Sequence, residues 1–171
     1  MIKAILQFGA LSARRAQQVD LEKDGDKLAY WIQDLKDTNE ANNGAGLAAP
    51  QIGIDRRMFV TRDGKIVINP IILYPECMKE EMSHQFEGCL SLPDMMGLTE
   101  RYPFVFAQWE YLVFEPTRLE KLTLAKISGT EAIVFQHEYD HLEGKTYIDR
   151  LMKPIRFGYT DLLKENFLRN G

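Results

Sequence analysis

The sequence has few of the features that mark secreted, membrane-spanning or disulfide-bonded proteins. Its 171 residues include only two cysteines, Cys77 and Cys89. No apolar run approaches the roughly 20 residues needed to span a bilayer, and the first residues lack the long apolar region of a secretory signal. We therefore expect an intracellular protein with no membrane role. In a reducing compartment a cysteine is better suited to metal binding or packing than to a disulfide, and Cys77, which has no motif around it, is expected to pack.

Charge of one sign is not concentrated anywhere along the chain. The formal net charge is −4, from 21 lysines and arginines and 25 aspartates and glutamates. A protein whose main ligand is nucleic acid usually carries a basic tract or stripe, and this sequence has none. We therefore expect no direct nucleic-acid function. Repeats, low-complexity segments and flexible linkers are also missing, so residues 1–171 are expected to form a single domain.

Hydrophobic periodicity predicts both helices and strands. Apolar residues at helix spacing predict a helix over residues 26–39. Residues 57–61 and 65–68 have the composition of strands around an Asp-Gly turn, and residues 104–114 and 122–127 are expected to pair antiparallel. A last amphipathic helix is expected from Pro154, with its packing face formed by Ile155, Tyr159, Leu162, Leu163 and Phe167. Strands that precede a central helix without alternation predict an α+β fold.

The segment His137-Glu138-Tyr139-Asp140-His141 is the most informative part of the chain. Two histidines four residues apart lie on the same face of a helix and can reach one metal ion. Glu138 then lies beside the metal, where a base for a water molecule is needed. Ser128 and Glu131 form a capping-box pattern at the start of this helix, and Gly144 is a natural terminator.

This helix is apolar on both sides, and such a helix is normally buried. We therefore expect antiparallel sheets packed around a central metal-binding helix, with an N-terminal and a C-terminal helix beside them. The pattern by itself indicates metal-assisted hydrolysis of an amide-type bond.

Two histidines fix a metal poorly, because catalytic zinc-type sites use three protein ligands. His84 has no special neighbours and is expected to be structural or exposed. Glu143 points about 200° away from His141 around the helix, which excludes it. Cys89, in Glu87-Gly88-Cys89-Leu90-Ser91, is the better candidate, with a buried core cysteine as the alternative. A further segment, residues 44–51, forms either a tight turn or a surface on which a substrate backbone lies.

Three segments together resemble the signatures of peptide deformylases. They are GAGLAAPQ (residues 44–51), EGCLS (87–91) and QHEYDHLEG (136–144), and they occur in the family's order. The resemblance implies that Cys89, His137 and His141 hold the metal and that Glu138 is the catalytic acid and base. It also implies that Gln51 and the backbone N–H of Leu90 form the oxyanion site. Ala45 and Gly46 are then expected to contact the substrate backbone.

The implied reaction is removal of the formyl group from the N-terminal formyl-methionine of new polypeptides, which releases formate. Nascent N-formylmethionyl chains are thus the expected partners, with the ribosome as the place of encounter and the cytoplasm of a bacterial-type cell as the location; an organellar origin remains open. Ile133 and Val134 lie one turn before His137 and are candidate walls for the methionine pocket, with ordinary core packing as the alternative.

The metal is one divalent ion. One thiolate and two imidazoles suit zinc, iron, cobalt or nickel. The resemblance implies Fe2+ in many members and Zn2+ in some, with Ni2+ or Co2+ as working substitutes.

The chain departs from the family pattern in residues 8–15 and 101–123, and neither departure affects the proposed ligands. Arg101 is expected either to pair with Glu87 and brace the metal loop or to be exposed to solvent. Two other functions compete with deformylation. A zinc endopeptidase of the HExxH type requires a third ligand downstream of His141. A non-catalytic, metal-stapled domain that binds nascent chains requires a closed site or a missing catalytic residue.

Overall fold

The computed structural model describes residues 1–11, 14–74, 82–114, 117–152 and 157–159. These residues form two antiparallel sheets and two long helices, joined by turns and loops. The first sheet has the strand order β1-β2-β3-β6-β7, and the second has the order β4-β5-β8. The strands are β1 (Gly46–Ala48), β2 (Met58–Thr61), β3 (Ile66–Leu73), β4 (Ser83–Cys89), β5 (Leu92–Arg101), β6 (Phe104–Phe114), β7 (Thr117–Ser128) and β8 (Phe157–Tyr159).

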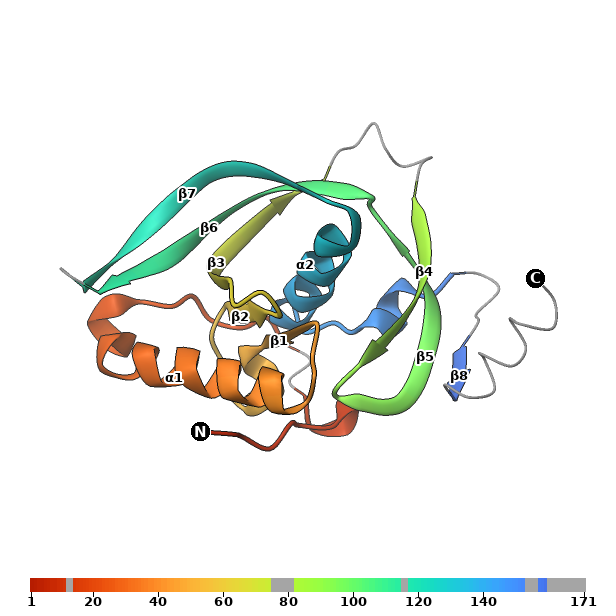
Figure 1. The fold of residues 1–171 in the computed structure, drawn as a ribbon, viewed down its shortest axis with the longest axis horizontal. Coiled ribbons are helices and arrows are strands. Elements are labelled where there is room, and N and C mark those ends of the chain that lie inside the picture. The colour runs from red at the N-terminus through yellow and green to blue at the C-terminus, as the bar shows by residue number, and fades with distance from the viewer. Residues whose placement is uncertain (12–13, 75–81, 115–116, 153–156, 160–171) are drawn as a thin grey trace.

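The helices are α1 (Leu21–Ala41) and α2 (Gly129–Leu142), with short 3-10 turns η1 (Phe8–Ala10), η2 (Ala49–Ile52) and η4 (Tyr147–Arg150). Figure 1 shows α2 in the middle of the molecule, between the β6–β7 hairpin and the β4–β5 hairpin, while α1 lies beside β1 and β2. The predicted α+β fold, with antiparallel sheets around a central helix, is thus confirmed. Among the described residues, no helix is long and apolar enough to cross a membrane.

The core explains why α2 is central. Phe135 packs edge-on against Phe59, with ring centroids 5.0 Å apart, and lies 5.7 Å from Trp109. These rings and the buried Leu142 attach one face of α2 to the five-stranded sheet. A second cluster, centred on Leu28, Leu35, Leu47, Met58 and Ile68, joins α1 to β1, β2 and β3. The opposite face of α2 is therefore left to point toward the β4–β5 hairpin.

The predicted elements are mostly present. The helix expected over residues 26–39 is α1, which begins earlier because the side chain of Asp20 caps it by accepting a hydrogen bond from the Glu22 N–H. The predicted strands correspond to β2, β3, β6 and β7, and β6 pairs antiparallel with β7 as expected. The strands β4, β5 and β8 were not predicted.

Two expectations at the ends of helices need correction. The capping box at α2 is not formed, because Ser128 ends β7 opposite Phe104 and Glu131 pairs with Lys65 instead. Gly144 does adopt a left-handed conformation (φ 70°) after the helix. In the expected C-terminal helix, residues 157–159 form strand β8 instead, with Tyr159 paired with Met95, and the other residues from Pro154 onward fall outside the described residues. Cys77 also falls outside them.

Candidate metal centre

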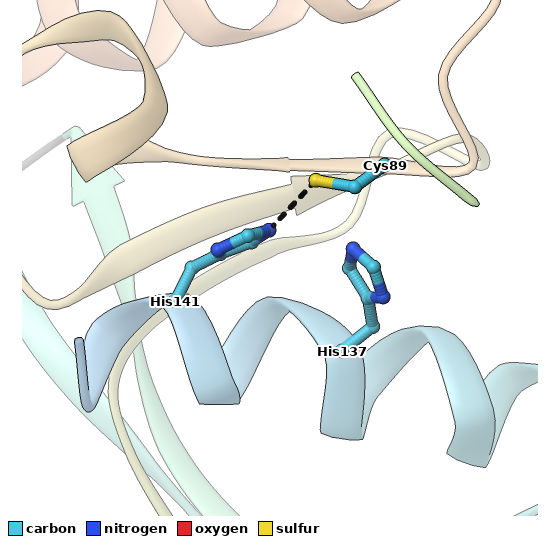
Figure 2. Close-up of side chains that lie close together, drawn as sticks. All are labelled: Cys89, His137 and His141. Carbon is cyan, nitrogen blue, oxygen red and sulfur yellow. Dashed lines mark hydrogen bonds between the residues drawn. The ribbon is translucent and has the colours of Figure 1, made fainter. Parts of the chain in front are cut away.

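Helix α2 and the end of β4 bring three ligand groups together. His137 and His141 lie one turn apart on α2, with ring centroids 5.0 Å apart and planes at 81°. Cys89 approaches from β4, and its Sγ lies 3.3 Å from Nε2 of His141, as Figure 2 shows. One ligand atom from each residue falls within 4.8 Å of the other two. Ligands at zinc-type bond lengths in a tetrahedron lie roughly 3.3–3.8 Å apart, so this spacing suits one ion.

The charge state of the histidines also fits a cation. Burial lowers the pKa of His141 to about 3, so its ring is neutral, as a metal ligand must be. Burial also opposes protonation of His137, but hydrogen bonds to Cys89 and Glu87 outweigh it and raise the pKa of His137 to about 10. The Glu87 carboxylate that favours a proton on His137 also favours a cation at the metal position. The residues present therefore fit a divalent metal.

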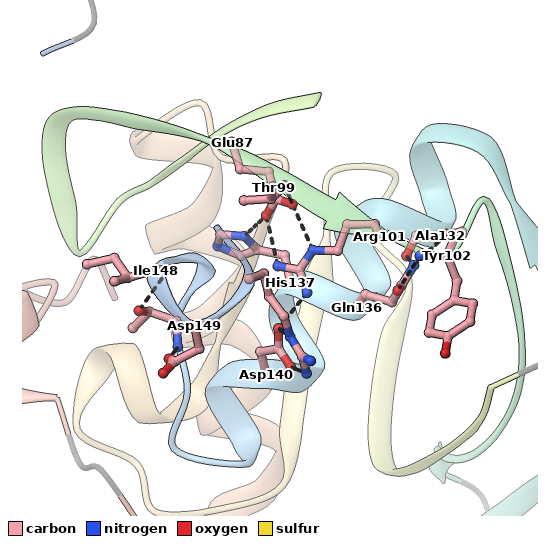
Figure 3. A network of polar contacts seen from close by, with 12 residues as sticks. Glu87, Thr99, Arg101, Tyr102, Ala132, Gln136, His137, Asp140, Ile148 and Asp149 are labelled. Atoms are coloured by element: carbon pink, nitrogen blue, oxygen red, sulfur yellow. Dashed lines mark hydrogen bonds and ion pairs between the residues drawn. The ribbon is translucent and has the colours of Figure 1, made fainter. Parts of the chain in front are cut away.

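A buried ionic network orients His137. Its Nδ1 lies 2.7 Å from Oε2 of Glu87, which leaves Nε2 to face the metal position. Arg101 donates to both oxygens of Glu87, at 2.7 and 2.9 Å, and also to Asp140 at 2.5 Å. Arg150 donates to both oxygens of Asp140, at 2.9 and 2.6 Å. Figure 3 shows this network, which links β4, β5, α2 and η4.

Arg101 is only 2% exposed, so the expected Glu87–Arg101 pair is confirmed and the solvent-exposed alternative is wrong. Burial opposes ionisation of Glu87, yet its hydrogen bonds to His137 and Arg101 hold its pKa well below the usual range. The carboxylate is therefore ionised in the fold. A charged acceptor on Nδ1 fixes both the tautomer and the orientation of a ligating imidazole.

Glu138 is buried and carries an unused oxygen. It is 3% exposed, and its Oε2 atom has no hydrogen-bond partner among the described residues. Burial raises the pKa of Glu138 to about 7, which suits a proton acceptor and donor at neutral pH. Gly46 makes room for this carboxylate, because a Cβ at that position would lie 2.6 Å from Oε1 of Glu138.

Gln51 points its amide N–H groups toward the same place. The buried Oε1 of Gln51 accepts a 2.8 Å hydrogen bond from the N–H of Ala48. This contact directs Nε2 toward Ser91 Oγ, at 3.2 Å, and toward Cys89 Sγ, at 3.5 Å. Leu90 follows Cys89 in the chain and lines the same cleft. The Gln51 amide therefore lies beside Cys89 at the candidate metal position, with Leu90 in the same cleft.

The predicted residues meet in one cleft of about 1010 Å³. Its walls include nine of the ten predicted metal-binding, catalytic and substrate-binding residues: Ala45, Gly46, Gln51, Cys89, Leu90, Ile133, Val134, His137 and Glu138. His141, the tenth, lies buried behind them. His84 is not a ligand; its half-exposed ring lies 3.5 Å from Glu100. Glu143 points away from the site, toward Arg57.

Other wall residues were not predicted from the sequence. Met95 and Met96 on β5 and Ile2 and Ile5 near the start of the chain line the cleft. Tyr147, fully buried in η4, stacks on His137 with ring centroids 6.3 Å apart and planes at 15°. No pattern in the sequence indicates the two methionines or Tyr147 as wall residues.

Comparison with known proteins gives consistent matches. A family model described as polypeptide deformylase matches residues 2–156. Peptide deformylase 1 of Bordetella pertussis is 34% identical, with 95% of each chain covered. Peptide deformylase of Pseudothermotoga lettingae is 36% identical, covering 96% of this chain and 92% of the relative.

Solved structures agree with the sequence relatives. The crystal structure of peptide deformylase from Thermotoga maritima matches with a TM-score of 0.76 at 35% identity, covering 89% of this chain and 99% of that one. A Plasmodium falciparum peptide deformylase complex with inhibitor matches with a TM-score of 0.74 at 30% identity, covering 88% and 90%.

Proposed function

The chain belongs to the peptide deformylase family, and from this premise we propose how its own residues perform the reaction. The protein is a metal-dependent hydrolase that removes the N-formyl group from new polypeptides. The zinc endopeptidase and the non-catalytic domain are therefore set aside. We propose that residues 1–171 act as a single catalytic domain.

Cys89, His137 and His141 are the proposed ligands of one divalent ion. Their mutual approach within 4.8 Å and the neutral ring of His141 support this assignment. Fe2+ is the proposed native ion. Zn2+, Ni2+ or Co2+ are proposed substitutes, because a donor set of two nitrogens and one sulfur suits all four ions. When bound, the ion would act as a Lewis acid that activates water and polarises the formyl carbonyl.

Glu138 is the proposed acid and base. It accepts the proton of the attacking water and then gives that proton to the amine that leaves. A partnerless Oε2 atom in a buried position supports this role, as does a pKa raised by burial to about 7. At neutral pH the carboxyl group exists in both protonation states, so it can perform both transfers.

Gln51 and Leu90 are the proposed oxyanion donors. As the formyl oxygen gains negative charge, the Gln51 side-chain amide and the Leu90 N–H stabilise it. The hydrogen bond from Ala48 to Gln51 Oε1 supports this role, because it holds the amide with its N–H groups toward the site. The Gln51 amide is therefore held toward the site before the reaction begins.

The proposed substrate is the extended N-terminus of a nascent formyl-methionyl chain. Ala45 and Gly46 offer their backbone to it, and Ile133 and Val134, which line the cleft, form walls for the methionine side chain. Recognition through backbone accepts any sequence after methionine. We place the encounter near the ribosome, in the cytoplasm.

One observation carries this proposal: three ligand atoms lie together beside a buried, partnerless carboxylate oxygen. Its test uses protein purified without oxygen, with metal content measured by elemental analysis and formate release measured from a formyl-Met tripeptide. We expect one metal per chain and formate release that a chelator abolishes. Formate release that persists after complete metal removal would contradict the proposed site, and no release from the loaded protein would contradict the proposed function.

A further inference from the structure

The loop that joins α1 to β1 separates two hollows. On one side, residues 42–46 line the cleft of about 1010 Å³ that holds the catalytic residues. On the other side, Asn43 and Gly44 also line a second hollow of about 600 Å³, whose other walls include Arg62, Asp63 and Gly64. Within residues 42–45 only Gly44 is buried, so the position of the loop depends largely on hydrogen bonds.

Arg62, which directly follows β2, makes three of those hydrogen bonds. Its Nη2 donates to the carbonyl of Asn43 at 2.7 Å, and its Nε donates to the carbonyl of Gly44 at 3.2 Å. Its backbone N–H donates to the carbonyl of Ala45 at 2.9 Å. One residue thus binds three successive carbonyls. A planar guanidinium can hold two acceptors in a fixed geometry, so the side chain restrains the direction as well as the position of the loop.

On its opposite side the loop is pressed against α1. The N–H of Gly44 donates to the carbonyl of Asn39 at 2.9 Å. A Cβ on Gly44 would lie 2.0 Å from Oδ1 of Asn39, so the backbone passes as close to the helix as only a glycine permits. Asn39 and Arg62 together fix the loop from two sides.

We propose that Arg62 is a positioning residue for substrate binding, because its side chain holds the wall that faces the substrate backbone. The inference rests on the proposed function. Gly46, which makes room for Glu138, is held separately by strand pairing with Thr61. Loss of the Arg62 side chain removes the hydrogen bonds to the carbonyls of Asn43 and Gly44, and so loosens the segment next to Ala45 without moving the catalytic carboxylate. A looser substrate wall with an unmoved carboxylate should change KM without changing kcat.

The test compares Arg62→Met and Gly44→Ala with the parent and with Arg118→Met. Arg118 is a half-exposed arginine on β7 that pairs with Glu120, and it serves as the matched control. For a formyl-Met tripeptide, we expect both loop variants to raise KM about tenfold, the effect of one lost ordering contact. We expect kcat within about twofold of the parent and unchanged metal content. Arg62→Lys is expected to lie between the parent and Arg62→Met, since an ammonium group lacks the fixed fork.

An unchanged KM in Arg62→Met would overturn the inference. So would a fall in kcat or in metal content with KM unchanged, because the side chain would then support the fold or the metal site and not the substrate wall. A parent protein that releases no formate would instead contradict the proposed function, so the two failures are distinguishable.

Discussion

The Nδ1 atom of His137 lies 2.7 Å from Oε2 of Glu87, and this contact connects the candidate metal centre to a buried charge network. Glu87 is in turn held by Arg101, which also binds Asp140 on the same helix as His137. Residues on strands β4 and β5 and on helix α2 therefore all contribute to the orientation of the His137 ring. Metal affinity should depend on residues that do not contact the ion.

Replacement of Glu87 by Gln tests this dependence. The amide keeps the shape but loses the charge that favours a cation at His137, and it weakens the pair with the buried Arg101. We expect metal affinity to fall about 10- to 100-fold, as is usual when such a partner is lost. Competition with a chelator measures it. Glu100→Gln is the matched control, because Glu100 lies on β5 with half its side chain exposed. Equal metal retention in both variants would contradict the orienting role.

Replacement of Glu138 by Ala separates metal binding from turnover. Glu138 is not among the three grouped ligands, so we expect metal content to stay at the parent level. Turnover should fall on the order of 10²–10⁴-fold, because the proton carrier is gone. Glu131→Ala, an exposed glutamate on the same helix, is the control. Formate release at the parent rate from metal-loaded Glu138→Ala would show that another group moves the proton.

Replacement of Cys89 by Ser tests the sulfur ligand. A neutral hydroxyl binds soft or borderline divalent ions more weakly than a thiolate, so dialysis should remove most of the metal from the variant. Elemental analysis before and after dialysis measures the loss. If the metal-to-protein ratio stayed the same, Cys89 would not be a ligand, although its Sγ lies 3.3 Å from His141.

The parts of the fold with strong periodicity were predictable from the sequence. Helix α1 has apolar residues at helix spacing, and strands β2, β3, β6 and β7 are rich in β-branched, aromatic or alternating apolar residues, so their local preferences agree with the fold. Strands β4 and β5 were missed for a physical reason. Pro93, Gly97 and two methionines interrupt any alternation in β5, so its extended form depends on pairing with β4 and β8.

The candidate site was predictable where its residues are close in sequence. The spacing of His137 and His141 places them on one helix face without tertiary information. Cys89 was a candidate from its motif, with a buried core cysteine as the alternative, and the resemblance decided between the two; nothing local brings a residue 52 positions away within 3.3 Å of His141. The contact of Arg101 with Asp140 spans 39 positions and depends on how β5 crosses α2. Contacts of this kind arise from the tertiary arrangement alone.

The ion pair between Asp24 and Arg56 should make stability depend on pH in the acid range. Arg56 donates two hydrogen bonds, at 2.7 and 2.8 Å, which lower the pKa of the buried Asp24 carboxyl below its ordinary value. A lowered folded-state pKa stabilises the protein above the unfolded value, and this contribution is lost as pH falls through the folded value.

We therefore expect Asp24→Asn to lower Tm at pH 7, with the difference from the parent shrinking below about pH 4. Thermal unfolding at several pH values measures this difference. Asp26→Asn, an exposed carboxylate on the same helix, is the control and should change Tm little at any pH. A difference between Asp24→Asn and the parent that stayed constant down to strongly acid pH would show that the pair does not stabilise the fold through its charge.

Replacement of Gly46 by Ala should impair turnover while the fold is kept. The added Cβ would lie 2.6 Å from Oε1 and 2.8 Å from Cγ of Glu138, so the carboxylate must shift. A displacement of about 1 Å costs on the order of 100-fold in rate when geometry is critical, and kcat should fall accordingly. Circular dichroism and metal analysis check that the fold and the metal are retained.

Gly25→Ala provides the matched substitution for Gly46→Ala. Gly25 lies inside α1, and its added methyl group would meet nothing within 4 Å. Alanine in a helix interior is favoured over glycine by about 0.5–1 kcal/mol, so this control should raise the free energy of unfolding and leave kcat unchanged. If Gly46→Ala also kept the parent kcat, the close packing of Gly46 on Glu138 would have no part in holding the carboxylate for proton transfer.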